Sequence, residues 1–258
     1  FKSVCQPLES MAVAGYKPSA DYFETLDSLV EQKKSEISAG DRSKLLYNCA
    51  LMEIAGVEVP RKLVKKWFSE ANKEKKPYTA NPEISNRLFL TSRVFSLAHK
   101  SESSLNAISF PRDKSTEQSR YYRALKKAIN LRAKQIPGIS MKLETEVANP
   151  LTRSRWDFCL TLTGTALNPK QKTVFWIQYD GPSHYRVVEG ERDYNLATKL
   201  QNHVFEKFAQ PHEKLRRIDY QEVEQKDIQS HCAELLEAMV ETHLKRSLNR
   251  GGDQQIRR

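Results

Sequence analysis

The chain has 258 residues, of which 42 are basic and 32 acidic, giving a formal net charge of +10 and an isoelectric point near 9.3. Mean hydropathy is −0.66, and no stretch approaches the roughly 18 consecutive apolar residues of a membrane span, so we expect no membrane-spanning segment. The excess of basic over acidic residues favours a polyanionic partner, because phosphates bound by Lys and Arg release counterions.

The four cysteines, Cys5, Cys49, Cys159 and Cys232, are scattered singly and form no C-x-x-C pair. This spacing disfavours a disulfide framework and a structural zinc site, and it predicts reduced thiols in a cytoplasm or organelle matrix. The chain begins with Phe1, and its first 16 residues lack the apolar core of a signal peptide. We interpret this start as a fragment boundary.

The pattern from residue 20 to about residue 100 is helical. Apolar residues recur at three- and four-residue intervals after the capping candidate Ser19, which predicts an amphipathic helix from Ala20. Asp41 is the predicted cap of a second helix, which Gly56 ends. Short helices joined by short polar turns predict packed helical hairpins, and degenerate RNA-binding repeats are one interpretation of residues 1–110.

Two further helices follow in this region. Pro60 stands at the first turn of one and Pro82 opens the other. The helix after Pro60 turns its apolar residues to the core and four basic residues away from it: Arg61, Lys62, Lys65 and Lys66. These four form a candidate phosphate-binding surface, with a solvated helix face as the alternative.

The segment from Ser101 to Thr116 is rich in Ser, Asn and Pro and marks the predicted domain boundary. After it, Ser119 to Gln135 is predicted to be a strongly basic helix. It either lies on a sheet with its basic side in water or presents that side to phosphates. The basic residues are Arg120, Arg123, Lys126, Lys127, Arg132 and Lys134.

The remaining chain alternates between strand and helix patterns. Strands are predicted at Ser140–Val147, Arg155–Leu162, Val174–Tyr179 and Lys214–Tyr220, and helices at Asn195–Phe208 and Ile228–Leu248. Together with the basic helix they form an α/β domain over residues 111–248. The basic tail, residues 249–258, is predicted to be disordered.

The strand Val174–Tyr179 is expected to lie inside the sheet, and it stops at Asp180-Gly-Pro, with His184 four residues later. A helix, three strands, a helix and a strand is the element order of restriction-type nuclease cores. In such chemistry strand carboxylates hold a divalent ion, Mg²⁺ or Mn²⁺, and an imidazole transfers a proton. The candidate metal ligands here are Asp157, Asp180 and Glu117, and His184 is the candidate proton donor.

The run Val174-Phe-Trp-Ile-Gln-Tyr-Asp-Gly-Pro-Ser-His184, followed by Thr198-Lys199 and by Arg217-Ile218-Asp-Tyr220, resembles the RAP domain. The Asp-Gly-Pro-Ser-His element is its most specific part. The resemblance covers Arg155 to about Glu222 well and residues 115–150 loosely. It implies an RNA-binding protein of RNA processing or stability, on a fold similar to the Vsr-like branch of PD-(D/E)xK nucleases.

One departure concerns metal binding. Nuclease relatives usually carry Glu two residues before the Asp-Gly, where this chain has Gln178, and an amide is a weaker ligand for a hard cation than a carboxylate. Asp180 itself stands where active nucleases usually have Lys. A Vsr-like site with Asp and His is the remaining route to cleavage.

Three functions from different classes therefore stand: an RNA-binding protein, a metal-dependent endoribonuclease using Asp157, Gln178, Asp180 and His184, and a protein-interaction module. Whether the protein is an enzyme is left open, as is its oligomeric state. The candidate RNA contacts are Arg61, Lys62, Lys65, Lys66, Arg120, Arg123, Lys126, Lys127, Arg155 and Lys199.

Overall fold

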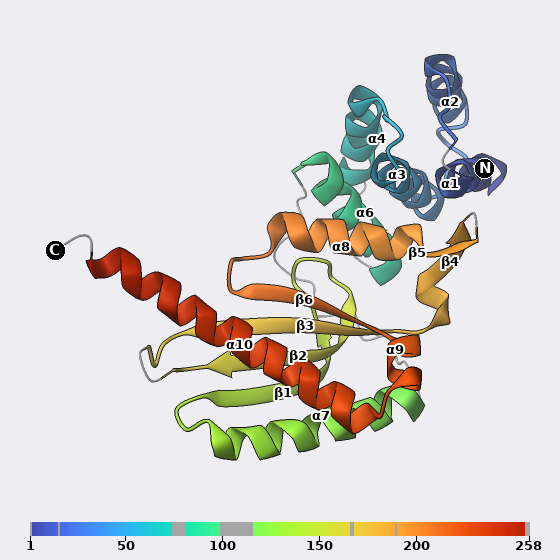
Figure 1. Ribbon diagram of the computed structural model, residues 1–258. Helices are drawn as coiled ribbons and strands as arrows, with labels where there is room; N and C mark the ends of the chain where they lie inside the picture. The colour runs from blue at the N-terminus through green and yellow to red at the C-terminus, as the bar shows by residue number, and fades with distance from the viewer. Residues whose placement is uncertain are drawn as a thin grey trace. The chain divides into compact units, whose positions relative to one another are not determined.

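The computed structural model describes residues 2–14, 16–73, 81–98, 116–165, 168–188 and 190–255 (Figure 1). Over these residues the fold mixes α-helix with β-sheet, as the sequence predicts. The chain divides into two compact units, and the predicted domain boundary at 101–116 falls almost wholly outside the described residues. Neither unit is a continuous stretch of the chain.

The first unit is helical and is drawn from Phe1–Ile108, Pro150–Ser154 and Arg186–Phe208. Helix α3 lies at its centre and packs against α1, α4, α6 and α8. A two-stranded sheet of β4 (Tyr185–Val188) and β5 (Glu191–Tyr194) precedes α8. The helices are α1 (Lys2–Ala14), α2 (Ala20–Gln32), α3 (Ala39–Ile54), α4 (Arg61–Lys73), α6 (Pro82–Phe95) and α8 (Leu196–Phe208).

Residues 186–208, which include α8, belong to the same unit as the N-terminal helices. The predicted division between residues 110 and 111 had assigned them to the second domain. Leu196, Leu200 and Val204 belong to the same buried cluster as the apolar residues of α3. The sequence shows only that α8 has one apolar face. Which partner covers that face depends on tertiary packing.

The ends of the first unit's helices follow local chemistry. Ser38, not the predicted Asp41, is the N-cap of α3: its Oγ accepts from the Asp41 N–H at 3.1 Å and donates to the Asp41 carboxylate at 2.7 Å. Gly56 ends this helix region with φ +79°, in the left-handed region that suits glycine. Asn81 caps α6 through its side-chain oxygen.

The second unit contains a four-stranded sheet of order β1-β2-β3-β6. β1 (Ser140–Ala148), β2 (Arg155–Thr163) and β3 (Lys172–Asp180) pair antiparallel, and β6 (Glu213–Asp219) pairs parallel to β3. β3 is therefore an interior strand, as predicted. Seven consecutive residues of β3 are buried before the strand ends with the buried Asp180.

Helices α7 (Thr116–Gln135) and α10 (Ile228–Gln255) cover one face of this sheet (Figure 1). Tyr121, Leu125 and Ile129 of α7 join the core formed by β2, β3 and α10. The chain also forms a short helix α9 (Tyr220–Gln225) and a 3₁₀ turn η1 (Pro182–His184), neither of which was predicted. α10 continues to Gln255, through most of the tail predicted to be disordered.

Three of the cysteines, Cys49, Cys159 and Cys232, are buried free thiols, and the Cys5 side chain lies outside the described residues. Burial raises the pKa of the Cys159 and Cys232 thiols to about 11, so both stay protonated at neutral pH and are poor nucleophiles. In the part of the chain that the structure describes, no helix is long and apolar enough to cross a bilayer.

Candidate functional site

Asp157, near the start of β2, is a buried carboxylate that accepts hydrogen bonds from three N–H groups. Gln118 donates to Oδ1 at 2.8 Å, and Gln178 and the Tyr179 backbone donate to Oδ2 at 2.6 and 2.7 Å. Such donors compensate a carboxylate for the water it loses on burial. Asp157 therefore links β2 to β3 and to helix α7.

Gln178 supplies one of these donors, which gives a physical reason for an amide at this position. The antiparallel register ends at the pair Phe158–Ile177, and the next residues along the two strands, Asp157 and Gln178, are hydrogen-bonded through their side chains. A Glu at 178 would bring a second carboxylate to within hydrogen-bonding distance of the first. Like charges that close disfavour each other. Gln178 therefore acts here as a hydrogen-bond donor rather than as a metal ligand.

Asp180, at the end of β3, is fully buried and contacts two basic groups. Arg217 on β6 donates to its Oδ1 at 2.6 Å, and the His184 Nδ1 lies 3.3 Å from the same oxygen. The η1 turn, closed by the His184 N–H bonding to the Gly181 oxygen, brings the imidazole back to the strand end. Asp180 and His184 therefore meet, as their spacing suggested.

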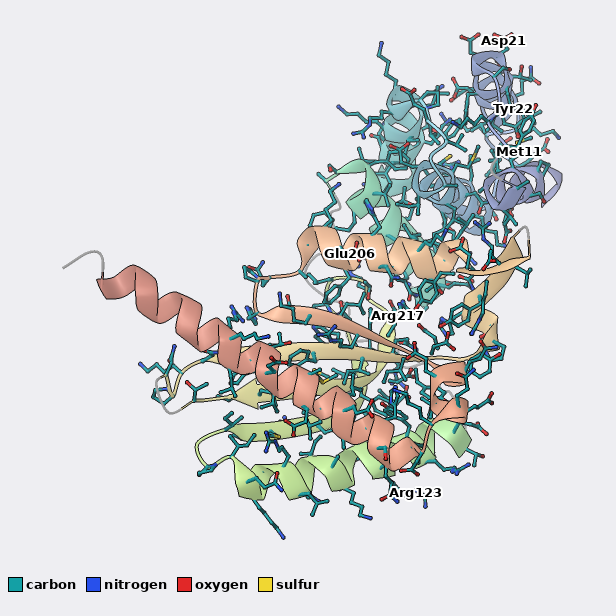
Figure 2. The ribbon with its side chains drawn as sticks, viewed as in Figure 1. Met11, Asp21, Tyr22, Arg123, Glu206 and Arg217 are labelled. Carbon is teal, nitrogen blue, oxygen red and sulfur yellow. The ribbon has the colours of Figure 1, made fainter. Side chains whose placement is uncertain are left out.

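Arg217 was not among the sequence candidates, although it lies in the Arg-Ile-Asp-Tyr segment that supports the resemblance. The parallel register pairs Arg217 with Gln178, beside Asp180, and its guanidinium also lies 5.6 Å from the centroid of the Trp156 ring. Figure 2 labels it on β6. Two adjacent arginines in a strand gave no signal for which one would meet the buried carboxylate.

The three proposed metal ligands lie in different surroundings. Asp157 lines a cavity with Glu146, Glu117 lines another with Arg120, and Asp180 is paired with Arg217. Among the residues that the structure describes, in either unit, no group of three His, Cys, Asp or Glu side chains could hold a metal ion. With Asp157 bonded to three N–H donors and Asp180 to a guanidinium, this ligand set does not fit Mg²⁺ or Mn²⁺.

The basic residues of α7 contact mainly neutral groups. Arg123 donates to the Ser119 backbone oxygen at 3.3 Å, Lys126 lies 5.7 Å from the centroid of the Tyr122 ring, and Lys127 donates to the Gln229 amide at 3.1 Å. Arg132 is the exception, since it forms an ion pair with Glu237. The contacts of Arg123, Lys126 and Lys127 are with neutral groups and so leave the charges of these three residues uncompensated.

The basic residues of α4 are arranged differently, because two of them pair with acids of the same unit. Lys66 lies 3.0 Å from Asp27 and 3.1 Å from Glu31, and hydrogen bonds to these acids raise its pKa. Arg61 lies 3.6 Å from Glu53. Lys62 and Lys65 are exposed.

The two remaining basic candidates also have acidic neighbours. Lys199 on α8 lies 2.5 Å from Asp193, and its ion pair lowers the pKa of that carboxyl group. Arg155 lies 3.9 Å from Glu146, which is beyond hydrogen-bonding distance. The predicted RNA contacts therefore belong to both units.

A search among family models, curated proteins and solved structures finds no match to this chain. The resemblance to the RAP domain rests on its sequence motif alone.

Proposed function

We propose that this protein binds RNA through the basic face of helix α7, in keeping with the RNA processing or stability role that the RAP resemblance implies. The observation that carries the proposal is the set of contacts on α7. Arg123, Lys126 and Lys127 are held by a backbone oxygen, an aromatic ring and an amide, so their charges remain available to phosphates. The net charge of +10 supports the same partner.

The helix suits this role mechanically as well. Its apolar side, with Tyr121, Leu125 and Ile129, is buried against the sheet, which fixes the orientation of the opposite side. Arg123 is labelled on α7 in Figure 2. A rigidly held basic face loses less side-chain and backbone freedom on binding than a mobile segment would.

A second candidate function, RNA cleavage, is favoured by the contact between Asp180 and His184. A buried carboxylate 3.3 Å from an imidazole that remains 24% exposed is suited to orient that ring for proton transfer. Arg217 contributes a positive charge beside it. We propose this candidate without a metal ion, since Asp157 and Asp180 already have N–H partners.

The deciding experiment mixes the full chain with labelled single-stranded and hairpin RNA at several salt concentrations, with and without Mg²⁺ or Mn²⁺. Binding that weakens with salt supports RNA binding. Product formation that is lost in His184→Ala supports cleavage, and cleavage that survives in this variant indicates a contaminating nuclease. If no RNA is bound at low salt, both candidates are rejected and a protein-interaction module remains.

A further inference from the structure

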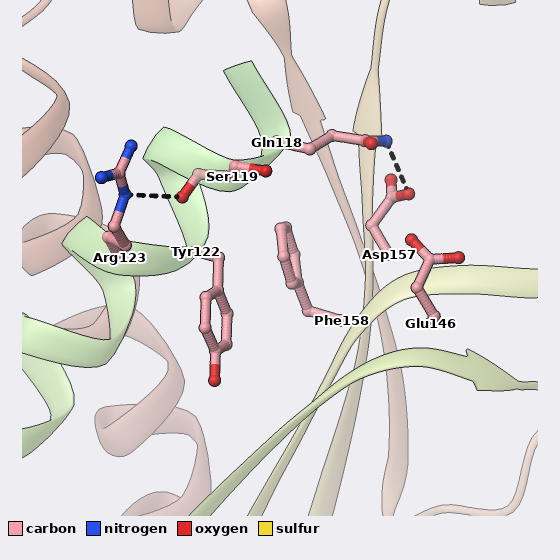
Figure 3. A pocket seen from close by; sticks show the side chains of 7 residues that line it. All are labelled: Gln118, Ser119, Tyr122, Arg123, Glu146, Asp157 and Phe158. Atoms are coloured by element: carbon pink, nitrogen blue, oxygen red, sulfur yellow. Dashed lines mark hydrogen bonds between the residues drawn. The ribbon is translucent and has the colours of Figure 1, made fainter. Parts of the chain in front are cut away.

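A cavity of about 330 Å³ lies between helix α7 and the strands β1 and β2 (Figure 3). All of its lining residues belong to the second unit. Its volume is at the lower end of the range for ligand sites, which suits one planar group rather than an extended chain.

One side of the cavity is aromatic. The rings of Tyr122 on α7 and Phe158 on β2 are stacked, with 14° between their planes and 6.3 Å between centroids. Phe158 is buried in the core and holds the wall in place, whereas Tyr122 is only half-buried. Bases stack on exposed aromatic side chains of single-strand-binding proteins.

The opposite side of the cavity carries Glu146 in an unusual backbone conformation. Glu146 has φ +52°, although it lies within β1. Its neighbours pair with β2, Thr145 with Phe158 and Val147 with Trp156, but Glu146 itself is not among the paired residues. Non-glycine residues held in this region often occur at functional sites. The conformation places the Glu146 carboxylate beside Asp157, at the cavity.

The two carboxylates differ in what they can do for a ligand. Asp157 already accepts from Gln118, as Figure 3 shows, and from β3. Glu146 is 3.9 Å from the Arg155 guanidinium and 21% exposed, so it can turn both oxygens to a donor. Asp157 is therefore engaged with Gln118 and β3, and Glu146 is the carboxylate of this cavity that is placed to accept from a ligand.

A carboxylate has two acceptor oxygens, so it binds best to a base that presents two neighbouring hydrogen-bond donors. Guanine has two neighbouring donors, N1–H and N2–H, on its Watson–Crick edge. Uracil has a single N–H between two carbonyl oxygens, which a carboxylate repels, and adenine and cytosine each present one amino group beside a ring acceptor. A bidentate contact therefore favours guanine over the other three bases.

We propose that this cavity is a nucleotide subsite, in which a guanine of single-stranded RNA stacks on Tyr122 and donates to Glu146. Arg123 lines the same cavity and Lys126 lies near the Tyr122 ring, so both are placed to hold the adjoining phosphates. The subsite rests on the proposed RNA-binding function and adds a base preference to it.

The test compares the binding of the full chain to three RNA decamers: ten uridines, the same with one central guanosine, and the same with one central adenosine. Fluorescence anisotropy in a buffer without divalent ions gives each affinity. We expect guanosine to raise the affinity by about 5- to 150-fold, the discrimination of a bidentate contact, and adenosine to raise it much less.

Two variants separate the base contact from the stacking contact. Glu146→Gln keeps the shape but offers one acceptor, so it should remove the guanosine preference without weakening the binding of ten uridines. Glu144→Gln is the matched control, because Glu144 lies on the same strand, is exposed and pairs with Lys142. Tyr122→Ala should weaken all three decamers, whereas Tyr122→Phe should not; circular dichroism checks that each variant folds.

The outcomes distinguish this subsite from the function on which it rests. If no decamer binds, RNA binding itself is rejected and the subsite with it. If the decamers bind with a salt dependence but without guanosine preference, or with a preference that Glu146→Gln retains, only the subsite is overturned. Binding of Mn²⁺ that depends on Glu146 and leaves decamer affinity unaltered would likewise overturn it, by making the cavity a cation site.

Discussion

The two basic helices, α4 in the first unit and α7 in the second, look alike in sequence and differ in their contacts. On α4, Lys66 lies between Asp27 and Glu31, and Arg61 lies near Glu53. On α7, Arg123 and Lys127 contact a backbone oxygen and an amide. A run of basic residues therefore shows how much charge a helix carries, and only its neighbours show how much of that charge remains for a partner.

Two ion pairs, Lys66–Asp27 of the first unit and Arg217–Asp180 of the second, differ in burial as well. Lys66 and Asp27 retain 39% and 24% of their side-chain exposure, whereas Arg217 and Asp180 retain 7% and 0%. Exposed pairs contribute little to stability, but removing one member of a buried pair leaves an uncompensated charge. The buried pair is therefore the more sensitive of the two.

The largest expected effect is on this buried pair. Arg217→Met should lower the free energy of unfolding by about 3–5 kcal/mol, because Asp180 loses its guanidinium partner. Lys66→Met, the matched change at the exposed pair, should lower it by less than about 1 kcal/mol. Urea denaturation measures both. The double variant Arg217→Met, Asp180→Leu should recover most of the loss, and no recovery would show that Arg217 acts through its packing on Trp156 instead.

The next effect concerns RNA. Replacing Arg120, Arg123, Lys126 and Lys127 by Gln should weaken binding by roughly 10- to 100-fold and lower the slope of log affinity against log salt by about 3, if each residue contacts one phosphate of a single strand. The same change at Arg61, Lys62, Lys65 and Lys66 should weaken it by no more than about threefold. Equal losses from the two helices would contradict the distinction between them.

A smaller effect should appear when an acid beside α4 is neutralised. Asp27→Asn removes the charge next to Lys66 but can still accept from the Trp67 indole, which donates to Asp27 at 2.9 Å. We expect RNA affinity to rise by about twofold to fivefold at low salt, with a steeper salt slope, as Lys66 becomes available. Glu237→Gln, beside Arg132 on α7, is the matched change and should act in the same direction. A fall in affinity for either variant would count against compensation as the cause.

The smallest effect is a pH dependence in the second unit. Burial lowers the pKa of His231, which lies 3.0 Å from the Tyr121 hydroxyl, so the folded state favours the neutral imidazole. Its contribution to stability is present above the unfolded pKa near 6.5 and is lost as the pH falls below it. Urea unfolding between pH 5 and 8 should show this loss, and His231→Gln should flatten it. An unchanged profile would exclude His231 as its origin.

Much of the secondary structure could be predicted from sequence, because periodicity and turn chemistry act over a few residues. The run Val174–Tyr179 and its exit at Asp180-Gly-Pro predicted β3, its interior position and its end. Pro82 and Gly56 likewise marked helix ends. The cap of α3 was misplaced by three residues, since Ser38 and Asp41 are both good capping residues and their mutual bonds decide which one serves.

The candidate site depended more strongly on tertiary structure. Sequence alone selected Asp157, Asp180 and His184 as residues with chemistry, and the four-residue spacing brought Asp180 and His184 together. Sequence reasoning missed Arg217 and Gln118, because each reaches its carboxylate from an element distant in the chain. It also missed Glu146, which lies on the neighbouring strand β1 and is directed by a backbone conformation that the sequence does not reveal. Which donors surround a buried carboxylate is settled by strand register and helix packing, and those long-range contacts decide whether Asp157 and Asp180 bond to N–H groups or to a cation.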